Sequence, residues 1–246
     1  MQTHPSFKEI KGAVFDLDGV ITKTMIIHAK AWKQMFDEYF KEYNKFHAAK
    51  QPPLDIEKEY PPYIDGIPRE DGVRNLLKHR GIILPEGTID DPPGRETIWG
   101  LSNKKLYLFT DLVNRDGVET YPATINKIYQ WRKLGIRTAV ISSSQSCCYI
   151  LDQSGILHLF DAVVDGKTSK DLNLKGKPHP DIFLEAAHQI QSPPEQSIAI
   201  EDATSGVEAA KRALYHTVIG INRQNQEQAL YHHGADIVVS SLKEIK

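Results

Sequence analysis

Two aspartates separated by one residue follow the first apolar run of the chain. The run Ala13–Phe15 leads into Asp16, Asp18 and Gly19, which stand in the order DLDG. A short apolar run that ends in charge and glycine is typical of a buried strand followed by a turn. Carboxylates at alternate positions point to opposite sides of an extended chain, unless the chain turns as glycine permits. One carboxylate could then attack a phosphorus atom while the other exchanges protons with the substrate oxygen; alternatively, one Asp only caps a loop or helix.

Three serines, Ser142 to Ser144, follow a second apolar run that ends at Ile141. We expect them at the start of a helix, where hydroxyl groups and free backbone N–H groups form an anion site. The alternative is that one serine simply caps the helix. The serines therefore indicate either an anion site or an ordinary helix start.

A lysine and a pair of acidic residues follow later in the chain. Lys177 stands among prolines before a predicted helix, where it could neutralise a phosphate and the charge of a nucleophile; the alternative is a solvated loop lysine. Glu201 and Asp202 come directly after another apolar run. Together with Asp16 they supply the hard oxygen ligands that Mg²⁺ prefers. Asp202 could also cap the helix that comes next.

From about residue 120, short β-rich runs alternate with helix-like segments. The runs predict strands at 136–141, 162–164, 197–200, 217–221 and 237–239. Most of the segments between them predict helices, at 124–134, 146–153, 180–190, 204–214 and 224–233. This alternation predicts βαβ units and a mostly parallel sheet, which is an α/β fold. Because ligands bind beyond the carboxyl ends of the strands in such a sheet, the four groups of polar residues are predicted to meet at one edge.

The region between the first strand and residue 118 has a different pattern. Aromatic and apolar residues recur at helical spacing over 26–47, which predicts an amphipathic helix, and a Pro-rich stretch at 48–63 predicts a loop. Two further helices are predicted at 69–80 and 95–115, each followed by glycine. No strand pattern occurs here. We therefore expect a core domain, residues 1–24 and 118–246, with a helical cap, residues 25–117, inserted after the first strand.

Composition excludes several classes of protein. The 246 residues include 30 Lys and Arg against 32 Asp and Glu, and this balance suggests no nucleic-acid or membrane partner. No apolar run approaches the ~18 residues that span a bilayer, and the polar N-terminus lacks the apolar stretch of a signal peptide. The cysteines, Cys147 and Cys148, are adjacent and match no zinc site. We expect both to be reduced and buried in a helix, and the protein to be a cytoplasmic monomer.

The four groups of polar residues, in this order, resemble the motifs of the haloacid dehalogenase superfamily, and the resemblance covers nearly the whole chain. It implies a Rossmann-like core and an aspartyl-phosphate intermediate on Asp16, with Asp18 as general acid and base. It further implies that Ser142 and Lys177 neutralise the oxygens of the transferring phosphoryl group. Dehalogenation is not expected, because dehalogenases of this superfamily lack the second Asp of the first motif.

The same resemblance implies a cofactor. We expect Mg²⁺ to be held by Asp16, the backbone carbonyl of Asp18, and Asp202, with Glu201 nearby.

A closer resemblance is to the β-phosphoglucomutase subfamily. The segment from Phe15 to Trp32, with Thr24 and His28, is similar to the opening of that enzyme. In the cap, the motif from Gly66 to Asp71 resembles its substrate loop and puts Arg69 at the phosphate-binding arginine; Lys105 stands where the family has a cap lysine. We expect these residues to bind substrate, and also Ser143 and Ser146. The sequence departs from the family at Lys23, which replaces an acidic residue, at Ser146, where asparagine is usual, and in the longer Pro-rich stretch.

Three functions follow from these patterns. A sugar phosphomutase is expected first, because a mutase must grip a second phosphate and Arg69 is placed to do so. A phosphatase acting on a sugar phosphate or a similar small metabolite would use the same core residues and let water attack the aspartyl phosphate. A receiver-like signalling domain is the remaining alternative, although such domains have no large helical insertion after the first strand.

Overall fold

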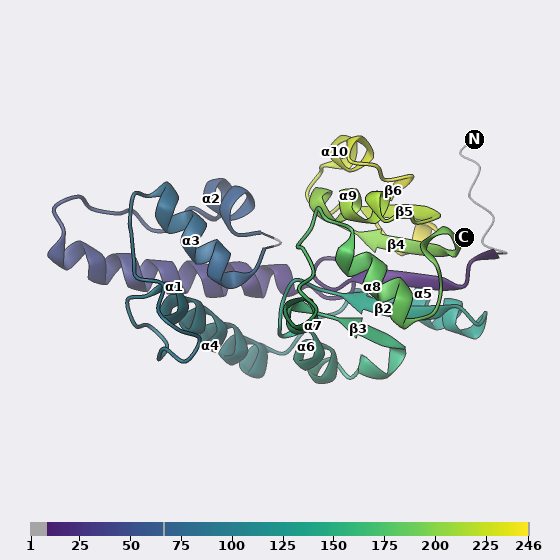
Figure 1. Ribbon diagram of the computed structural model, residues 1–246, viewed down its shortest axis with the longest axis horizontal. Helices are drawn as coiled ribbons and strands as arrows, with labels where there is room; N and C mark the ends of the chain where they lie inside the picture. The colour runs from purple at the N-terminus through teal and green to yellow at the C-terminus, as the bar shows by residue number, and fades with distance from the viewer. Residues whose placement is uncertain (1–8, 66, 246) are drawn as a thin grey trace. The chain divides into compact units, whose positions relative to one another are not determined.

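Figure 1 shows the computed structural model, which describes residues 9–65 and 67–245. The chain divides into two compact units. One runs up to Lys23 and resumes at Val118; the other is Thr24–Gly117. Gly66, the first residue of the expected substrate-loop motif, lies outside the described residues.

The first unit is built on a parallel sheet of six strands, counted over the described residues, in the order β3-β2-β1-β4-β5-β6. The strands are β1 (Gly12–Asp16), β2 (Arg137–Ile141), β3 (Ala162–Val164), β4 (Ser197–Glu201), β5 (Thr217–Ile221) and β6 (Ile237–Val239). This confirms the predicted α/β fold. The strand order reverses between β1 and β4, which is where doubly wound sheets bind their ligands.

The central strands are buried on both faces, as their uninterrupted apolar sequences require. Every residue of β1 and of β4 is buried. In the register of the sheet, Asp16 lies beside Ile141 of β2, and Phe15 lies beside Ile200 of β4. The residues that follow these strands therefore leave the sheet at the same edge.

Helices join the strands of this unit. They are α5 (Pro122–Lys133), α6 (Cys147–Gln153), α7 (Gly166–Asp171), α8 (Asp181–Gln189), α9 (Thr204–Arg212) and α10 (Glu227–His232), with short 3₁₀ helices η2 (Leu157–Leu159), η3 (Pro194–Gln196) and η4 (Leu242–Glu244). Helix α7 was not expected from the sequence. It is a six-residue helix started by Asp165, whose carboxylate accepts hydrogen bonds from the backbone N–H groups of Lys167 and Thr168. A helix this short shows no apolar periodicity.

The second unit consists of α1 (Thr24–Phe46), α2 (Ile56–Tyr63), α3 (Arg69–His79) and α4 (Ile98–Asp116); its described residues contain no strand. The aromatic stripe predicted for the first helix is buried: Trp32, Phe36 and Phe40 stack in sequence along α1 with ring centroids 5.5–5.6 Å apart. These rings supply much of the core of the unit, because aromatic side chains bury large apolar areas.

The prediction of a loop over the Pro-rich stretch is wrong at 56–63, where α2 forms with two prolines, Pro61 and Pro62, inside it. Proline lacks a backbone N–H group and normally ends a helix. Here Asp55 caps the helix, accepting hydrogen bonds from the N–H groups of Glu57 and Lys58 at 3.0 and 3.1 Å. The rest of α2 and the stretch before it are held by contacts with residues that are distant in the sequence.

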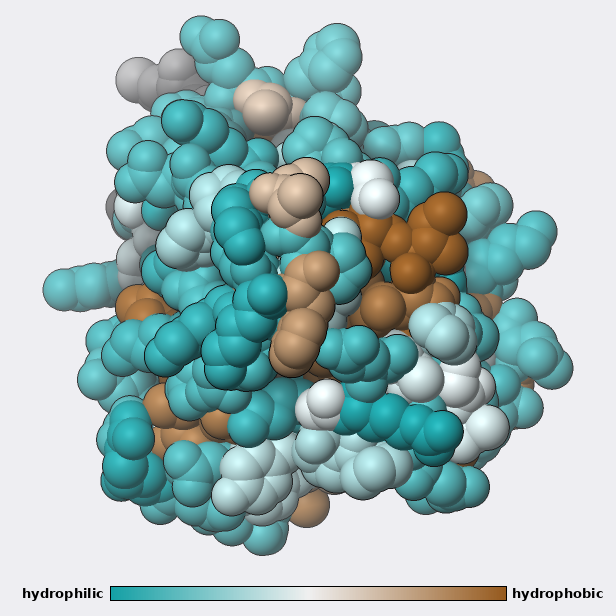
Figure 2. Space-filling model, turned by 90° about the vertical axis from the view of Figure 1, so that its left-hand side faces the viewer, coloured by the Kyte–Doolittle hydropathy of each residue, from teal (hydrophilic) through white to brown (hydrophobic). Residues whose placement is uncertain are grey.

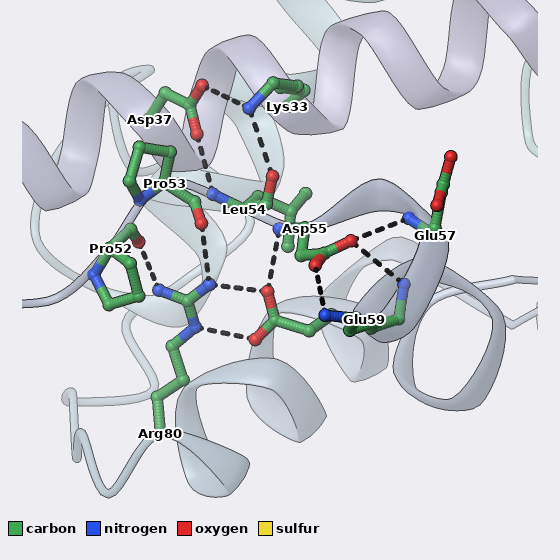
Figure 3. Close-up of polar contacts among 10 residues, drawn as sticks. Lys33, Asp37, Pro52, Pro53, Leu54, Asp55, Glu57, Glu59 and Arg80 are labelled. Atoms are coloured by element: carbon green, nitrogen blue, oxygen red, sulfur yellow. Dashed lines mark hydrogen bonds and ion pairs between the residues drawn. The ribbon is translucent and has the colours of Figure 1, made fainter.

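Figure 3 shows the residues that hold the Pro-rich stretch. Arg80, at the end of α3, donates from Nε to Oε1 of Glu59 at 2.8 Å, and its guanidinium group also donates to the carbonyls of Pro52 and Pro53. The two charged side chains are only 6 % and 13 % exposed. Burial alone would raise the pKa of Glu59, but the hydrogen bonds from Arg80 and from the Asp55 N–H group bring this pKa below its ordinary value.

Side chains of α1 also bind the backbone of the Pro-rich stretch. Lys33 donates to the carbonyl of Leu54 at 3.0 Å, and Asp37 accepts from the Leu54 N–H group at 2.8 Å (Figure 3). The Pro-rich stretch is therefore ordered by side chains from α1 and α3.

No helix of the described residues is both long and apolar enough to cross a membrane. On the face drawn in Figure 2, hydrophilic residues predominate and hydrophobic ones gather in separate patches. Scattered exposed apolar side chains, such as Phe46 and Ile83, are ordinary on protein surfaces.

Replacing Arg80 with Met should lower the free energy of unfolding by about 3–5 kcal/mol, because it leaves the Glu59 carboxylate buried without its cation. Arg115, whose ion pair with Asp116 is exposed, is the matched control, and Arg115→Met should leave the free energy of unfolding nearly unchanged. Urea unfolding of both variants measures the difference. Equal losses would show that the Arg80–Glu59 pair does not hold the stretch.

Candidate active site

A buried lysine bridges two carboxylates at the carboxyl edge of the sheet. Asp16 ends β1, Glu201 ends β4, and Lys177 lies in the loop before α8. The Lys177 ammonium group donates to Oδ1 of Asp16 at 2.6 Å and to Oε1 of Glu201. The three side chains are at most 10 % exposed. Three of the four groups that the sequence predicted to meet at this edge, those of Asp16, Lys177 and Glu201, are therefore in contact.

The charged groups of this cluster shift one another's pKa. Burial raises the pKa of Asp16; Lys177 lowers it, and the neighbouring charges of Glu201 and Asp18 raise it again, so that the pKa stays well above its ordinary value. Burial alone would lower the pKa of Lys177, but its two carboxylate partners raise it above its ordinary value. Lys177 is therefore a permanent cation beside the expected nucleophile.

The same edge has the donor set for a metal ion. Asp16, Glu201 and Asp202 each offer a carboxylate oxygen, and these atoms lie within 4.8 Å of one another. All three residues are buried, and one lysine does not balance three carboxylates. Buried charge of one sign is costly unless it is compensated. Clustered carboxylate oxygens suit a hard divalent cation such as Mg²⁺.

Two backbone N–H groups hold the carboxylate of Glu201. Its Oε2 accepts hydrogen bonds from the N–H groups of Asp202 and Ala203, each at 2.9 Å. Helix α9 starts after Ala203 without a side-chain cap, so Asp202 does not cap it, contrary to the alternative that the sequence left open. The carboxylate of Glu201 instead ties down the backbone that carries Asp202.

Asp18 lies near the buried group of Asp16, Lys177 and Glu201, and Ser142 lies near Asp18. Asp18 is half-buried, and the Ser142 hydroxyl is 3.5 Å from its Oδ2. The expectation that the serines start a helix is wrong, because α6 begins only at Cys147. The segment 142–146 is a turn instead, in which Ser142 Oγ accepts from the Ser144 N–H group at 3.1 Å.

Two expected substrate contacts, Ser143 and Ser146, belong to the same turn, and both are partly exposed.

The cysteines that follow this turn differ from each other. Cys147 is buried as expected, whereas Cys148 is exposed, and both are free thiols. Residue 148 faces solvent because the apolar side of this short helix is made by Cys147, Ile150 and Leu151.

In the second unit, two of the expected substrate residues contact each other. Lys105 Nζ is 2.7 Å from Nδ1 of His28, and it also lies over the rings of Phe109 and Trp32 at 4.8 and 5.4 Å. Burial, and then the charge of Lys105, hold the pKa of His28 well below its ordinary value. His28 is therefore a neutral imidazole whose Nδ1 accepts a hydrogen bond from the Lys105 ammonium group. Thr24, the first residue of α1, is buried.

Arg69 is the first residue of α3, after a proline that supplies no side-chain cap. It is half-buried, and its Nε is a buried donor without a hydrogen-bond partner among the described residues. The nearby acidic residue Asp71 is paired with Arg74. A cation is unfavourable at a helix N-terminus, and an unpaired buried donor costs free energy. An anionic ligand would relieve both.

Sequence reasoning missed two glycines that shape the site. A Cβ added to Gly206 would overlap the carboxylate of Glu201, and one added to Gly166 would lie 2.5 Å from the Ser143 carbonyl oxygen. Gly206 is in the first turn of α9, shortly after Glu201 and Asp202, whereas Gly166 starts α7, which follows β3. The position of Gly206 after the acidic pair is the sequence feature that could have revealed it.

The parallel sheet and the carboxylates at its carboxyl edge together define a class of enzymes. A family model described as haloacid dehalogenase-like hydrolase matches residues 10–213, and the chain belongs to this family.

Among curated relatives, the β-phosphoglucomutase of Mycobacterium tuberculosis is 38 % identical over 241 residues, which cover 97 % of this chain and 92 % of the relative. The β-phosphoglucomutase of Bacillus subtilis is 30 % identical over 236 residues, covering 96 % and 92 %. The crystal structure of β-phosphoglucomutase from Clostridium difficile superposes with a TM-score of 0.74 at 23 % identity, covering 96 % of this chain and 93 % of that one. The chain is therefore an enzyme similar to β-phosphoglucomutases along nearly its whole length.

Replacing Gly206 with Ala should lower the free energy of unfolding by about 1–3 kcal/mol, since the new methyl group must displace the Glu201 carboxylate from a close-packed site. Gly176 is the control, because nothing lies within 4 Å of the methyl group that Gly176→Ala would add. Denaturant unfolding of the two variants gives the comparison. If Gly206→Ala is as stable as Gly176→Ala, the close approach to Glu201 is not a constraint.

Proposed function

We propose that the enzyme is a phosphomutase of the β-phosphoglucomutase type, which moves a phosphoryl group between positions of a sugar phosphate through an aspartyl phosphate on Asp16. The observation that carries this proposal is the buried bridge of Lys177 between Asp16 and Glu201, with Asp18 two residues beyond the nucleophile. A carboxylate nucleophile next to a fixed cation, with a second carboxylate in its turn, suits covalent phosphoryl transfer.

Each residue of this edge has a separate task in the proposed reaction. Asp16 attacks the phosphorus in line, and Lys177 compensates the negative charge of the phosphoryl oxygens. Ser142 donates to the same oxygens. Because Lys177 is held by two carboxylates, it needs no rearrangement when the phosphoryl group arrives.

Asp18 exchanges the proton of the sugar oxygen. It is less buried than Asp16, and the Ser142 hydroxyl lies 3.5 Å from its Oδ2. It can therefore protonate the leaving oxygen when Asp16 is phosphorylated, and remove the proton from the accepting hydroxyl in the return step.

Mg²⁺ fits the cluster of Asp16, Glu201 and Asp202, and the backbone carbonyl of Asp18 is the remaining protein ligand that we propose. A bound Mg²⁺ would supply positive charge next to the phosphoryl oxygens. Since Glu201 Oε2 already accepts two backbone hydrogen bonds, Glu201 also keeps Asp202 and Lys177 in place.

The distinction between mutase and phosphatase depends on a second phosphate grip. A mutase passes through a bisphosphate, and while one phosphate reacts at Asp16 the other must be held elsewhere. Arg69 suits this task because a guanidinium group binds phosphate bidentately and stays charged. We propose that Arg69 holds that phosphate and that Thr24, His28, Lys105, Ser143 and Ser146 contact the sugar phosphate.

Incubation with β-glucose 1-phosphate and a trace of bisphosphate tests the function directly. We expect isomerised sugar phosphate to exceed free phosphate, measured by ³¹P NMR, and Asp16→Asn to form neither product because an amide is not a nucleophile. Free phosphate alone would instead identify a phosphatase. Turnover by Asp16→Asn at more than a trace of the wild-type rate would remove Asp16 from the mechanism.

Chelation with EDTA should stop turnover, and Mg²⁺ should restore it. The added metal should raise the melting temperature only modestly, because Mg²⁺ keeps several waters and binds weakly to such sites. Activity assays and thermal scans with and without metal measure both effects. Full activity in metal-free buffer would contradict the metal role of the acidic cluster.

Replacing Arg69 with Ala should lower mutase turnover by at least about tenfold, since a charge-assisted contact contributes about 1.5–3 kcal/mol. Hydrolysis of acetyl phosphate, which has no second phosphate end, should fall far less. Arg74 on the same helix is the control, because its guanidinium group is already paired with Asp71 and Glu86. If Arg74→Ala lowers mutase turnover as much, the effect belongs to α3 and not to a phosphate site.

A further inference from the structure

The loop between β5 and α10 contacts both acidic segments of the active site. Arg223 donates from Nε to the carbonyl oxygen of Gly19 at 2.7 Å. Gln226, three residues later, donates to the carbonyl oxygen of Asp202 at 2.9 Å. The loop thus braces the backbone at the ends of β1 and β4, although none of its residues was singled out from the sequence.

The turn that Arg223 contacts carries Asp18. Its backbone is closed by the N–H groups of Ile21 and Thr22, both of which donate to the carbonyl of Leu17, and by the Gly19 N–H group, which donates to the Thr22 carbonyl. Gly19 has a positive φ of 82°. Glycine adopts many backbone conformations, so a glycine turn needs outside contacts to keep one of them. The hydrogen bond from Arg223 is such a contact, on the residue directly after Asp18.

Arg223 is itself held in place on two further sides. Its Nη1 donates to the carbonyl of Ser240 at 3.1 Å, and its guanidinium carbon lies 3.7 Å from the centre of the Tyr121 ring. The Tyr121 N–H group donates to the Ile21 carbonyl at 2.8 Å. The ring that supports the arginine is therefore bonded to the same turn that the arginine fixes.

We propose that Arg223 is a positioning residue that fixes the turn of Asp18 and so aims its carboxylate at the sugar oxygen. This inference rests on the proposed function, in which Asp18 exchanges that proton. Arginine suits the position because its planar group can donate in two directions while it stacks on an aromatic ring. A lysine could keep the charge and one hydrogen bond, but not this geometry.

The test compares two phosphoryl donors. Protonation of the leaving group matters for β-glucose 1-phosphate and little for acetyl phosphate. The rate of Asp16 phosphorylation by β-glucose 1-phosphate, divided by the rate with acetyl phosphate and measured by rapid quench, therefore reports on Asp18. Asp18→Asn should lower this ratio by about 10²–10⁴. Arg223→Ala should lower it by about 10- to 100-fold, the scale of a small misplacement of a catalytic group.

Three further variants make the result specific. In the Asp18→Asn background, Arg223→Ala should change the ratio by no more than about twofold, because both substitutions then act through one group. Arg223→Lys should give an intermediate ratio, and it replaces Arg223→Ala if that variant does not fold. Arg137 is the matched control: it also donates to a backbone carbonyl, that of Ile190 at 2.8 Å, but at the start of β2, so Arg137→Ala should leave the ratio unchanged.

The outcomes separate the two proposals. If Asp18→Asn lowers the ratio and neither Arg223 variant does, Arg223 only supports the fold and the inference is overturned while the proposed function stands. If Arg223→Ala lowers the ratio further in the Asp18→Asn background, the inference is overturned as well. If Asp18→Asn itself leaves the ratio unchanged, the role of Asp18 in the proposed function fails, and the positioning role fails with it.

Discussion

The ion bridge of Lys177 between Asp16 and Glu201 is the constraint on which the rest of the active site depends. Buried charges are tolerated only when their partners are held in good geometry, and here each partner is held by a different part of the fold. Strands β1 and β4 are neighbours, which brings Asp16 and Glu201 to one edge. Two backbone N–H groups then orient Glu201, and only a glycine at position 206 leaves room for its carboxylate. Arg223 adds a brace to the turn beyond Asp16.

Much of the α/β fold could be predicted from the sequence, for a physical reason. Parallel strands are buried on both faces, so they stand out as uninterrupted apolar runs, and polar residues directly after such a run must lie at the ligand-binding edge. Asp16 and Glu201 were found in this way, whereas Lys177 was found from the prolines around it, ahead of a predicted helix. The aromatic spacing of α1 was equally informative, because a long helix with one buried face repeats its apolar residues many times.

The features that escaped prediction are those set by contacts between distant residues. Helix α2 contains two prolines and forms where local propensity predicts a loop; Arg80, more than 20 residues away, holds Glu59 and two proline carbonyls. The short turn at Ser142 could not be told from a helix start, since both place serines after a strand. Arg223 has no local pattern at all, and its importance appears only when the carbonyl oxygen that it contacts is known.

The sheet order has a consequence for how the enzyme is made on the ribosome. Strand β1 is synthesised first and ends in the middle of the sheet, but its neighbours β2 and β4 begin only at Arg137 and Ser197. The nascent chain therefore holds a hydrophobic strand with two unpaired edges while more than half of the protein is still to be translated, a state that favours aggregation. The whole of the unit Thr24–Gly117 is translated during that interval. Asp16 is thus among the first residues of the active site to be translated, and its lysine partner comes 161 residues later.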